Sequence, residues 1–485
     1  SCPWCRTPLG PDAFDLQPTP DKPKSLVLGC LDADCPFCAA NDPAGLPVLF
    51  VDEEVYQELP CFIVATVDKF AMLPWRGETG KLLGKVVARA GRAFFGPADG
   101  PVPREDGVTR LPSGLPPPEL VVQDELHLIS GPLGTMVGLY ETALERLGSE
   151  VRTREVDGHV EDEIVARPKI IAATATVRRA NEQIRALFGR HDVRQFPPAG
   201  LDDQETWFST VDDDTGPGGS LRTPGRLYVG VAAPGRAMKA ILLRTYAALL
   251  SAAQSQYDRD GGPTQPADGY MTLVGYFNAL RELGGMRRLV EDDVRTRCAG
   301  PDERRPLDWA GPHPWLGARE IHREPVELTS RRPTGELTES KQRLASPFAG
   351  ERPVDVVLAS NMISVGVDID RLGLMVVAGQ PKTTAEYIQA TSRVGRQLRW
   401  PGLVVTCFNV AKPRDRSHYE RFGAYHDSFY RFVEAPSLTP FSGPALDRGL
   451  AATLVAMARF STPALTPHDG AQALHEHRAA LDQAR

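Results

Sequence analysis

The sequence predicts an α/β protein with two domains, each built on a mostly parallel sheet, preceded by a small cysteine-rich module and followed by a helical segment. Three observations lead to this prediction. Apolar runs typical of buried strands alternate with helical patterns in two series, a stretch rich in Gly, Pro and Asp divides the series, and five of the eight cysteines lie before residue 40. With 485 residues and 42% hydrophobic content, the chain can bury more than one core.

The cysteine-rich module is expected to span residues 1–45. Cys2 and Cys5 form one C-x-x-C pair, and Cys30, Cys35 and Cys38 form a second cluster after a loop of suitable length for a tetrahedral zinc site. Five cysteines compete for four ligand positions, so either Cys30 with Cys35 or Cys35 with Cys38 completes the set. A structural zinc ion in a reducing compartment explains this pattern better than a disulfide scaffold does.

The first α/β domain is expected at residues 46–200. Its Gly- and Pro-rich interval, 91–118, predicts an excursion on the surface. The elements predicted around that interval are a buried strand leading into a helix at 61–73, a strand with an acidic end at 118–129, a third strand at 168–176 and a helix at 177–190.

A linker at 201–225 is expected to lead into a second α/β domain at 226–411, which is followed by a helical C-terminal segment at 412–485. The linker prediction rests on its run of Gly, Pro and Asp. The second domain has apolar strand patterns at 225–233, 272–278, 324–330, 354–360, 371–379 and 402–409, and helical patterns at 237–254 and 279–294.

Asp124 and Glu125 stand at the carboxyl end of a predicted strand, which is where open parallel sheets bind ligands. One carboxylate there can hold Mg²⁺ through water, and the next can orient or deprotonate an attacking water. Thr174 and Thr176 end the following strand, where hydroxyl groups can hydrogen-bond to the acidic pair. A solvated strand end would also explain either motif taken alone.

Arg393 and Arg396 lie three residues apart, which predicts that both lie on one face of a helical turn. Two guanidinium groups there could bind the γ-phosphate of a nucleotide and stabilise charge during phosphoryl transfer. Upstream, the segment 360–368 follows an apolar strand, and its glycine, amides and hydroxyls suit phosphate, while Asp368 could bind a ribose or the arginines. Surface arginines and an ordinary strand-to-loop connection are the alternatives.

Taken together, the order of these motifs resembles that of helicase superfamily 2. DELH at 124–127 resembles motif II, TAT at 174–176 motif III, SNMISVGVD at 360–368 motif V, QATSRVGR at 389–396 motif VI, and TVDK at 66–69 motif Ib. The resemblance extends over about residues 60–410. More narrowly, the phrases CPWC, DELHLISGPLGT and ELTSR and the aromatic tail are similar to the helicases of bacterial DISARM anti-phage systems.

The resemblance implies two RecA-like domains that bind ATP and Mg²⁺, a DNA substrate, a DrmB-like protein partner and a role in restricting phage DNA. It favours Cys2, Cys5, Cys30 and Cys35 as the zinc ligands. By motif, the catalytic residues are expected to be Asp124, Glu125, His127, Arg393 and Arg396; the ATP-binding residues Gln389, Gly366, Asp368, Thr174 and Thr176; and the nucleic-acid-binding residues Thr66, Lys69, Asn278, Thr329, Arg331, Ser360 and Asn361.

One motif of the family is missing from this sequence. A phosphate-binding P-loop, G-x-x-x-x-G-K-[ST], should precede Thr66, and nothing there fits it. The nearest candidate, at 77–82, lies after motif Ib and has Leu82 where a hydroxyl must bind Mg²⁺, so we interpret it as a turn. Because the chain also begins on Ser1, we expect a fragment of a longer protein that is inactive as an ATPase alone.

The net charge of −7 excludes a global basic field of the histone-like kind, so nucleic-acid contacts must be local. The tail at 414–431 interleaves Arg and His with Tyr and Phe, which suits stacking on unpaired bases. However, Phe422, Tyr425 and Phe429 recur at helical spacing, which favours packing against the domain. The sequence has no long apolar run and no secretory signal, so a soluble cytoplasmic protein is expected.

The sequence therefore predicts an ATP-dependent DNA helicase or translocase. Two other functions remain open at this stage. The chain could be a non-catalytic nucleic-acid-binding scaffold subunit, or a helicase that acts on RNA, because these motifs hold a nucleic-acid backbone without distinguishing DNA from RNA.

Overall fold

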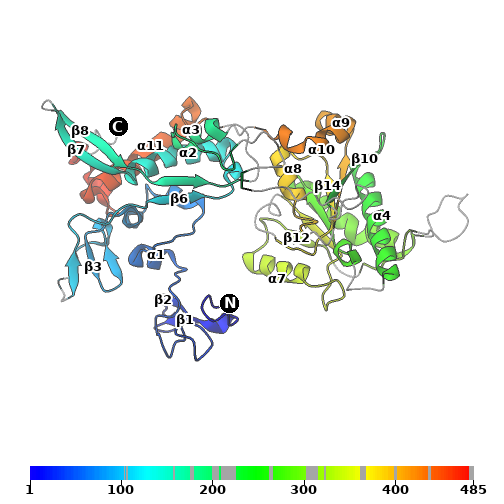
Figure 1. The fold of residues 1–485 in the computed structure, drawn as a ribbon, viewed down its shortest axis with the longest axis horizontal. Helices are drawn as coiled ribbons and strands as arrows, with labels where there is room; N and C mark the ends of the chain where they lie inside the picture. The colour runs from blue at the N-terminus through cyan, green and yellow to red at the C-terminus, as the bar shows by residue number, and fades with distance from the viewer. Residues whose placement is uncertain are drawn as a thin grey trace, which may run out of the picture. The chain divides into compact units, whose positions relative to one another are not determined.

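The computed structural model divides into two compact units, which are described separately (Figure 1). Unit 1 comprises Ser1–Thr174, Arg179–Val193 and Pro436–Arg485, and unit 2 comprises Ala175–Arg178 and Arg194–Ala435. The structure describes residues 1–102, 104, 107–156, 159–174, 180–198, 207–208, 225–260, 266–301, 315–321, 324–360, 368–397, 401–434 and 438–479.

Unit 2 is built on a six-stranded sheet in which every neighbouring pair of strands is parallel. Its strand order is β10-β15-β14-β11-β13-β12. These strands coincide with the six apolar runs of the second predicted domain, so the α/β prediction is confirmed there. Their bounds are β10 Arg226–Ala232, β11 Leu273–Phe277, β12 Val326–Leu328, β13 Val356–Ala359, β14 Leu374–Ala378 and β15 Gly402–Phe408.

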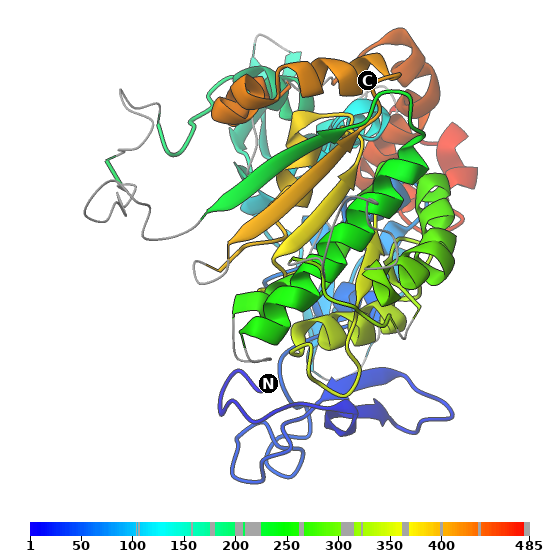
Figure 2. The same ribbon diagram turned by 90° about the vertical axis from the view of Figure 1, so that its right-hand side faces the viewer.

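Helices cover both faces of this sheet, and the strand residues alternate between two cores. On one face, Leu273 and Phe277 pack with residues of α4, α5 and α6, and Figure 2 shows α4 lying across that face. On the other face, Val274 and Tyr276 pack with residues of α7 and α8. All residues of β11, β13 and β14 are therefore buried, as expected for parallel strands covered on both sides. The helices are α4 Met238–Arg259, α5 Leu280–Leu289, a π-helical turn Val290–Val294, α6 Arg295–Ala299, α7 Thr334–Ala345 and α8 Thr384–Thr391.

Two buried ion pairs lie near the amino-terminal ends of the central strands. Arg319 donates to Asp355, which precedes β13, at 2.7 Å, and to the carbonyl oxygen of Met271 at 2.6 Å. Arg371 lies 3.2 Å from Asp268 and donates to the hydroxyl of Thr272 at 2.7 Å. Neither arginine belongs to a motif, and both act by holding the ends of strands in place.

Unit 1 contains a two-stranded parallel sheet, β6 with β9, and its largest helix packing is α2 against α11 and α3. The described part of unit 1 also contains two antiparallel hairpins, a three-stranded antiparallel sheet, the short helix α1 and several 3-10 helices. The bounds are β1 Phe14–Gln17, β2 Ser25–Leu28, α1 Asp52–Glu58, β3 Ala88–Ala90, β4 Ala93–Phe95, β5 Val108–Arg110, β6 Leu120–Gln123, α2 Gly131–Leu147, β7 Glu150–Val156, β8 His159–Ala166, β9 Lys169–Ala172, α3 Ala180–Phe188 and α11 Gly443–Ser461.

The prediction of a buried strand at 61–66 is wrong. These residues form no strand, and Phe62 and Val64 are 77% and 85% exposed. The physical reason is that a strand needs hydrogen-bonded neighbours, and none of the described strands pairs with this segment. The residues that follow form a 3-10 helix, Val67–Met72, where the start of an α-helix was expected. The predicted excursion at 91–118 carries β4 and β5, so part of it is a small sheet.

The C-terminal segment is helical as predicted, but it divides between the units. Helices α9 Pro413–Glu420 and α10 Phe422–Asp427 belong to unit 2, whereas α11 belongs to unit 1. Tyr425 is buried, and its ring lies 5.4 Å from that of Phe429 and 6.4 Å from that of Tyr387. These aromatic residues therefore pack against the sheet domain, which is the structural interpretation of their helical spacing. Among the described residues, no helix is both long and apolar enough to cross a membrane.

Candidate functional site

Asp124 and Glu125 follow β6 directly, at the carboxyl end of the strand. Asp124 is exposed, and its Oδ1 accepts a hydrogen bond from the backbone N–H of Glu125 at 2.9 Å. Glu125 has a φ of 50°, in the left-handed region that residues other than glycine rarely adopt. Such backbone strain tends to persist where function requires a defined side-chain position.

His127 connects the acidic pair with the neighbouring strand. Its side chain is 8% exposed, and its Nδ1 lies 3.2 Å from Oε2 of Glu125 and 3.2 Å from the hydroxyl of Thr174. The backbone reinforces this link, because the N–H of Leu126 donates to the carbonyl oxygen of Ala173. The expected contact between the acidic motif and Thr174 is thus made through His127. Thr176 lies outside the described residues.

Arg393 and Arg396 are brought together by Asp368 and not by a helix. Helix α8 ends at Thr391, so the prediction of a shared helical turn is wrong. Arg393 donates to Oδ1 of Asp368 at 2.6 Å, and Arg396 donates to the same oxygen. The hydrogen bond from Arg396, with the charges of both arginines, lowers the pKa of Asp368 below its ordinary value. Asp368 therefore stays ionised at neutral pH and holds the two guanidinium groups beside each other.

Gly395 makes the turn between the two arginines possible. Its φ is 61°, and a Cβ at this position would lie 2.4 Å from the backbone nitrogen of Gly402. Both the dihedral angle and the close approach require glycine here. The glycine of the R-x-G-R sequence is therefore required by the backbone conformation, in addition to the two arginines that supply the charge.

Gln389 is 6% exposed, and its Nε2 has no hydrogen-bond partner among the described residues. Buried amide nitrogens are nearly always paired in folded proteins, so an unpaired one suggests a missing acceptor. A nucleotide would supply such an acceptor. Gly366, which was expected to bind ATP with Gln389, lies outside the described residues, as does Asn361.

Three of the expected nucleic-acid contacts follow adjacent strands of the sheet. Asn278 follows β11, Ser360 follows β13 and Thr329 follows β12, so all three lie along one edge. Ser360 is 6% exposed, Thr329 is fully buried, and the side-chain amide of Asn278 donates to the carbonyl oxygen of Ala378 at 3.3 Å. Of the second-domain residues in this group that the structure describes, Arg331 is the exposed one.

The first-domain contacts expected for nucleic acid, Thr66 and Lys69, are both exposed. Nζ of Lys69 lies 2.5 Å from Oδ2 of Asp52 in helix α1. An exposed ion pair of this kind contributes little to stability, so a phosphate can compete for the lysine.

The segment 77–83 is a structural element and does not resemble a phosphate cradle. It forms a 3-10 helix, as the interpretation of a turn implied, and Lys81 is 5% exposed and lies 2.8 Å from Oδ2 of Asp99. A Cβ at Gly77 would lie 1.9 Å from the carbonyl oxygen of Thr466. The glycine here serves close packing.

Four cysteines gather at the N-terminal module. The sulfur atoms of Cys2, Cys5, Cys30 and Cys35 all lie within 4.8 Å of one another, with 3.9 Å between Cys2 and Cys35 and 3.4 Å between Cys5 and Cys30. Four thiolates about 2.3 Å from a tetrahedral zinc ion lie roughly 3.8 Å apart, so these residues fit the ion. Cys38 is outside the group. The four-thiolate arrangement suits a structural metal, because it leaves no open coordination position.

Two charged residues outside the motifs lie next to the strand-end residues expected to bind nucleic acid: Glu327 accepts a hydrogen bond from Thr329, and Arg287 lies 3.9 Å from Glu327. A signal was present, since Glu327 interrupts an otherwise apolar strand pattern. Sequence alone did not indicate its partner 40 residues upstream.

The chain is similar to known helicases. Residues 320–397 match the family model of the helicase conserved C-terminal domain. The chain is 42% identical over 475 residues to DISARM protein DrmA of Bacillus paralicheniformis, an alignment that covers 96% of this chain and 39% of that protein. The chain thus spans about two fifths of the length of this curated relative.

Similar solved structures include two helicases. The DUF1998 helicase MrfA bound to DNA is 17% identical with a TM-score of 0.43, covering 74% of this chain and 38% of MrfA. The Mycobacterium smegmatis helicase Lhr bound to ssDNA and AMP-PNP is 15% identical with a TM-score of 0.42, covering 70% of this chain and 34% of Lhr.

Proposed function

This chain belongs to the helicases of superfamily 2, and from that membership we propose that it is part of an ATP-dependent DNA helicase or translocase that acts in bacterial anti-phage defence. The observation that carries the proposal is the identity to a DISARM protein over nearly the whole chain. The arginine pair held by Asp368 and the strained acidic strand end support it, because both are arrangements that phosphoryl transfer uses.

In the proposed mechanism, ATP hydrolysis depends on the acidic strand end and on the arginine pair. Asp124 would hold Mg²⁺ through water, and the ion would neutralise charge on the phosphates, while Glu125 orients the attacking water or accepts its proton. Arg393 and Arg396 bind the transferring phosphate and stabilise the charge that spreads over it. The buried amide of Gln389 binds the nucleotide, and Gly366 and Asp368 are proposed to bind it as well. His127 transmits changes at Glu125 to Thr174.

Nucleic acid is proposed to be held by its backbone, through Thr66 and Lys69 in unit 1 and through the strand ends in unit 2. DNA is proposed as the substrate because the relative belongs to an anti-phage system, and a DrmB-like protein is the proposed partner. Cys2, Cys5, Cys30 and Cys35 would hold a zinc ion, which would stabilise the small N-terminal module.

The test compares the ATPase activity of this chain with that of a longer version extended upstream to include a P-loop, each with and without DNA. We expect DNA-stimulated activity in the longer protein alone, and we expect the Glu125→Gln variant to abolish it while leaving DNA binding intact. Nucleic-acid binding without ATPase activity in either form would refute the proposal and favour a scaffold subunit. A clear preference for RNA in competition binding would instead favour an RNA-directed helicase.

A further inference from the structure

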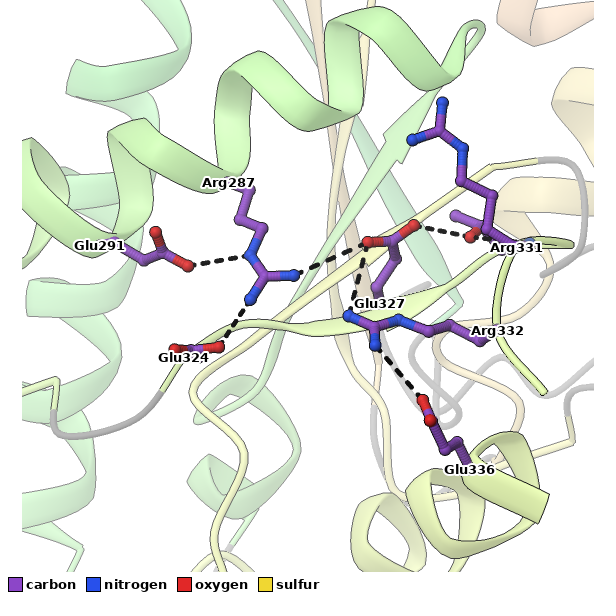
Figure 3. A network of polar contacts seen from close by, with 8 residues as sticks. Arg287, Glu291, Glu324, Glu327, Arg331, Arg332 and Glu336 are labelled. Atoms are coloured by element: carbon purple, nitrogen blue, oxygen red, sulfur yellow. Dashed lines mark hydrogen bonds and ion pairs between the residues drawn. The ribbon is translucent and has the colours of Figure 1, made fainter. Parts of the chain in front are cut away.

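A network of charged side chains surrounds Glu327, the polar residue in the middle of β12 (Figure 3). Arg287 of α5 lies 3.9 Å from Oε2 of Glu327, and Arg332 lies 3.8 Å from the same oxygen. Arg287 also donates to Glu324 at 2.6 Å and to Glu291 at 2.9 Å, and Arg332 lies 3.3 Å from Glu336 of α7. Glu327, with an 11% exposed side chain, is the member shared by both arginines.

The other carboxylate oxygen of Glu327 holds the turn that follows the strand. The hydroxyl of Thr329, which is fully buried, donates to Oε1 of Glu327 at 2.7 Å. Thr329 in turn accepts the backbone N–H of Arg331 on its hydroxyl, at 3.4 Å, and that of Arg332 on its carbonyl oxygen, at 3.2 Å. Glu327 therefore fixes both the start of this turn, through Thr329, and its end, through Arg332.

Arg331 lies inside the turn, and unlike Arg287 and Arg332 it does not form an ion pair with a carboxylate of this network. Its side chain is exposed, and its guanidinium makes no hydrogen bond or ion pair with the residues that the structure describes. Figure 3 shows it extending away from Glu327. The charges of Arg287 and Arg332 are taken up by carboxylates, so the positive charge that this turn offers to a ligand is that of Arg331.

We propose that Glu327 is a positioning residue for nucleic-acid binding: by holding Thr329 and Arg332 it sets the turn that presents Arg331 to a backbone phosphate. The inference rests on the proposed function, because it takes nucleic acid as the ligand. It assigns Thr329 an indirect role, since a fully buried hydroxyl that donates to Glu327 is not placed to touch the ligand. Arg287 completes the arrangement by fixing Glu327 to α5.

The direction of one effect separates this proposal from plain electrostatics. Removing a carboxylate near a phosphate site makes the surface more positive, which by itself tightens nucleic-acid binding. If Glu327 positions Arg331, removing its charge must weaken binding despite that gain. Glu324 is the matched control, because it belongs to the same network, is 75% exposed and contacts Arg287 without touching the turn.

The experiment measures binding of the full chain to a fluorescein-labelled single-stranded DNA by fluorescence anisotropy at several salt concentrations. Arg331→Ala is expected to weaken binding about fivefold and to reduce the salt dependence by about one phosphate contact. Glu327→Gln and Thr329→Val are each expected to weaken DNA binding by about threefold or more. When either is combined with Arg331→Ala, the double variant is expected to bind as weakly as Arg331→Ala alone. Glu324→Gln is expected to bind as the unchanged protein or more tightly, and Thr329→Ser, which keeps the hydroxyl, is expected to bind more tightly than Thr329→Val.

The hydrogen-exchange rates of the backbone amides of Arg331 and Arg332 measure the stability of the turn in the absence of nucleic acid. We expect Glu327→Gln to accelerate both several-fold and Glu324→Gln to leave them unchanged. If Glu327→Gln binds DNA as tightly as the unchanged protein while Arg331→Ala binds weakly, the positioning role is wrong although the contact stands. If Arg331→Ala leaves the affinity for DNA unchanged, Arg331 does not contact nucleic acid and the proposal is overturned. If Glu327→Gln leaves the hydrogen-exchange rates of the turn unchanged, Glu327 does not position the turn.

Discussion

Replacing Glu141 with Gln should stabilise unit 1 at alkaline pH and have little effect at acidic pH. Glu141 lies in α2 and is 6% exposed, and burial, together with the nearby charge of Glu145, raises the pKa of its carboxyl from 4.5 to about 7. Between these values the unfolded chain releases a proton that the folded chain retains, so the free energy of unfolding falls as the pH rises. Glutamine has nearly the same shape and no charge to bury.

The size of the effect follows from the two pKa values. Counted from strongly acidic pH, the contribution of Glu141 lowers the free energy of unfolding by roughly 1 kcal/mol at pH 5 and by roughly 3 kcal/mol at pH 8. Each pH unit between the two pKa values corresponds to about 1.4 kcal/mol. Glu141→Gln should remove this change. The variant should therefore gain roughly 2 kcal/mol relative to the unchanged protein on going from pH 5 to pH 8.

Urea unfolding read by pulsed hydrogen exchange at the α2 amides measures this for unit 1 alone, which matters because the chain has two units. Glu145→Gln serves as the contrasting variant, because Glu145 lies 2.5 Å from Arg190 and loses an ion pair when neutralised. A Glu141→Gln variant that shows no gain between pH 5 and pH 8, or that is destabilised at pH 8, would refute the reasoning.

Three further outcomes are expected. Asp355→Ala leaves Arg319 buried without its ion-pair partner and should lower the stability of unit 2 by about 3 kcal/mol or more in urea unfolding, whereas a change below about 1 kcal/mol would show that the pair is dispensable. Cys35→Ser should release zinc in a chromogenic chelator assay while Cys38→Ser retains it, and equal retention by both would exclude the four-cysteine site. Gly395→Ala should reduce DNA-stimulated ATP hydrolysis of the longer protein by tenfold or more, about 1.4 kcal/mol, because the alanine cannot adopt the backbone between the two arginines; unchanged kcat would argue against their role.

The strands of unit 2 could be predicted closely, whereas in unit 1 the sequence predicted β6 and β9 correctly and wrongly predicted a strand at 61–66. Apolar runs such as Val356–Ala359 formed strands because neighbouring strands from the same domain pair with them. The equally apolar run at 61–66 lies exposed, because no described strand supplies its hydrogen bonds. Apolar composition indicates a capacity to form a strand, and a partner decides whether the strand forms.

The candidate site shows the same division. The sequence by itself determined the six parallel strands, the order of the motifs and the cysteine pairs, since local periodicity and short spacing carry that information. Only the tertiary structure decided that Cys38 lies outside the sulfur cluster and that Asp368, and not a helix, holds Arg393 beside Arg396. It also decided that Thr329 hydrogen-bonds to Glu327 while Arg331 stays exposed. These outcomes depend on which side chains meet across many intervening residues, and ion pairing, hydrogen bonding and burial act on distance in space and not on separation along the chain.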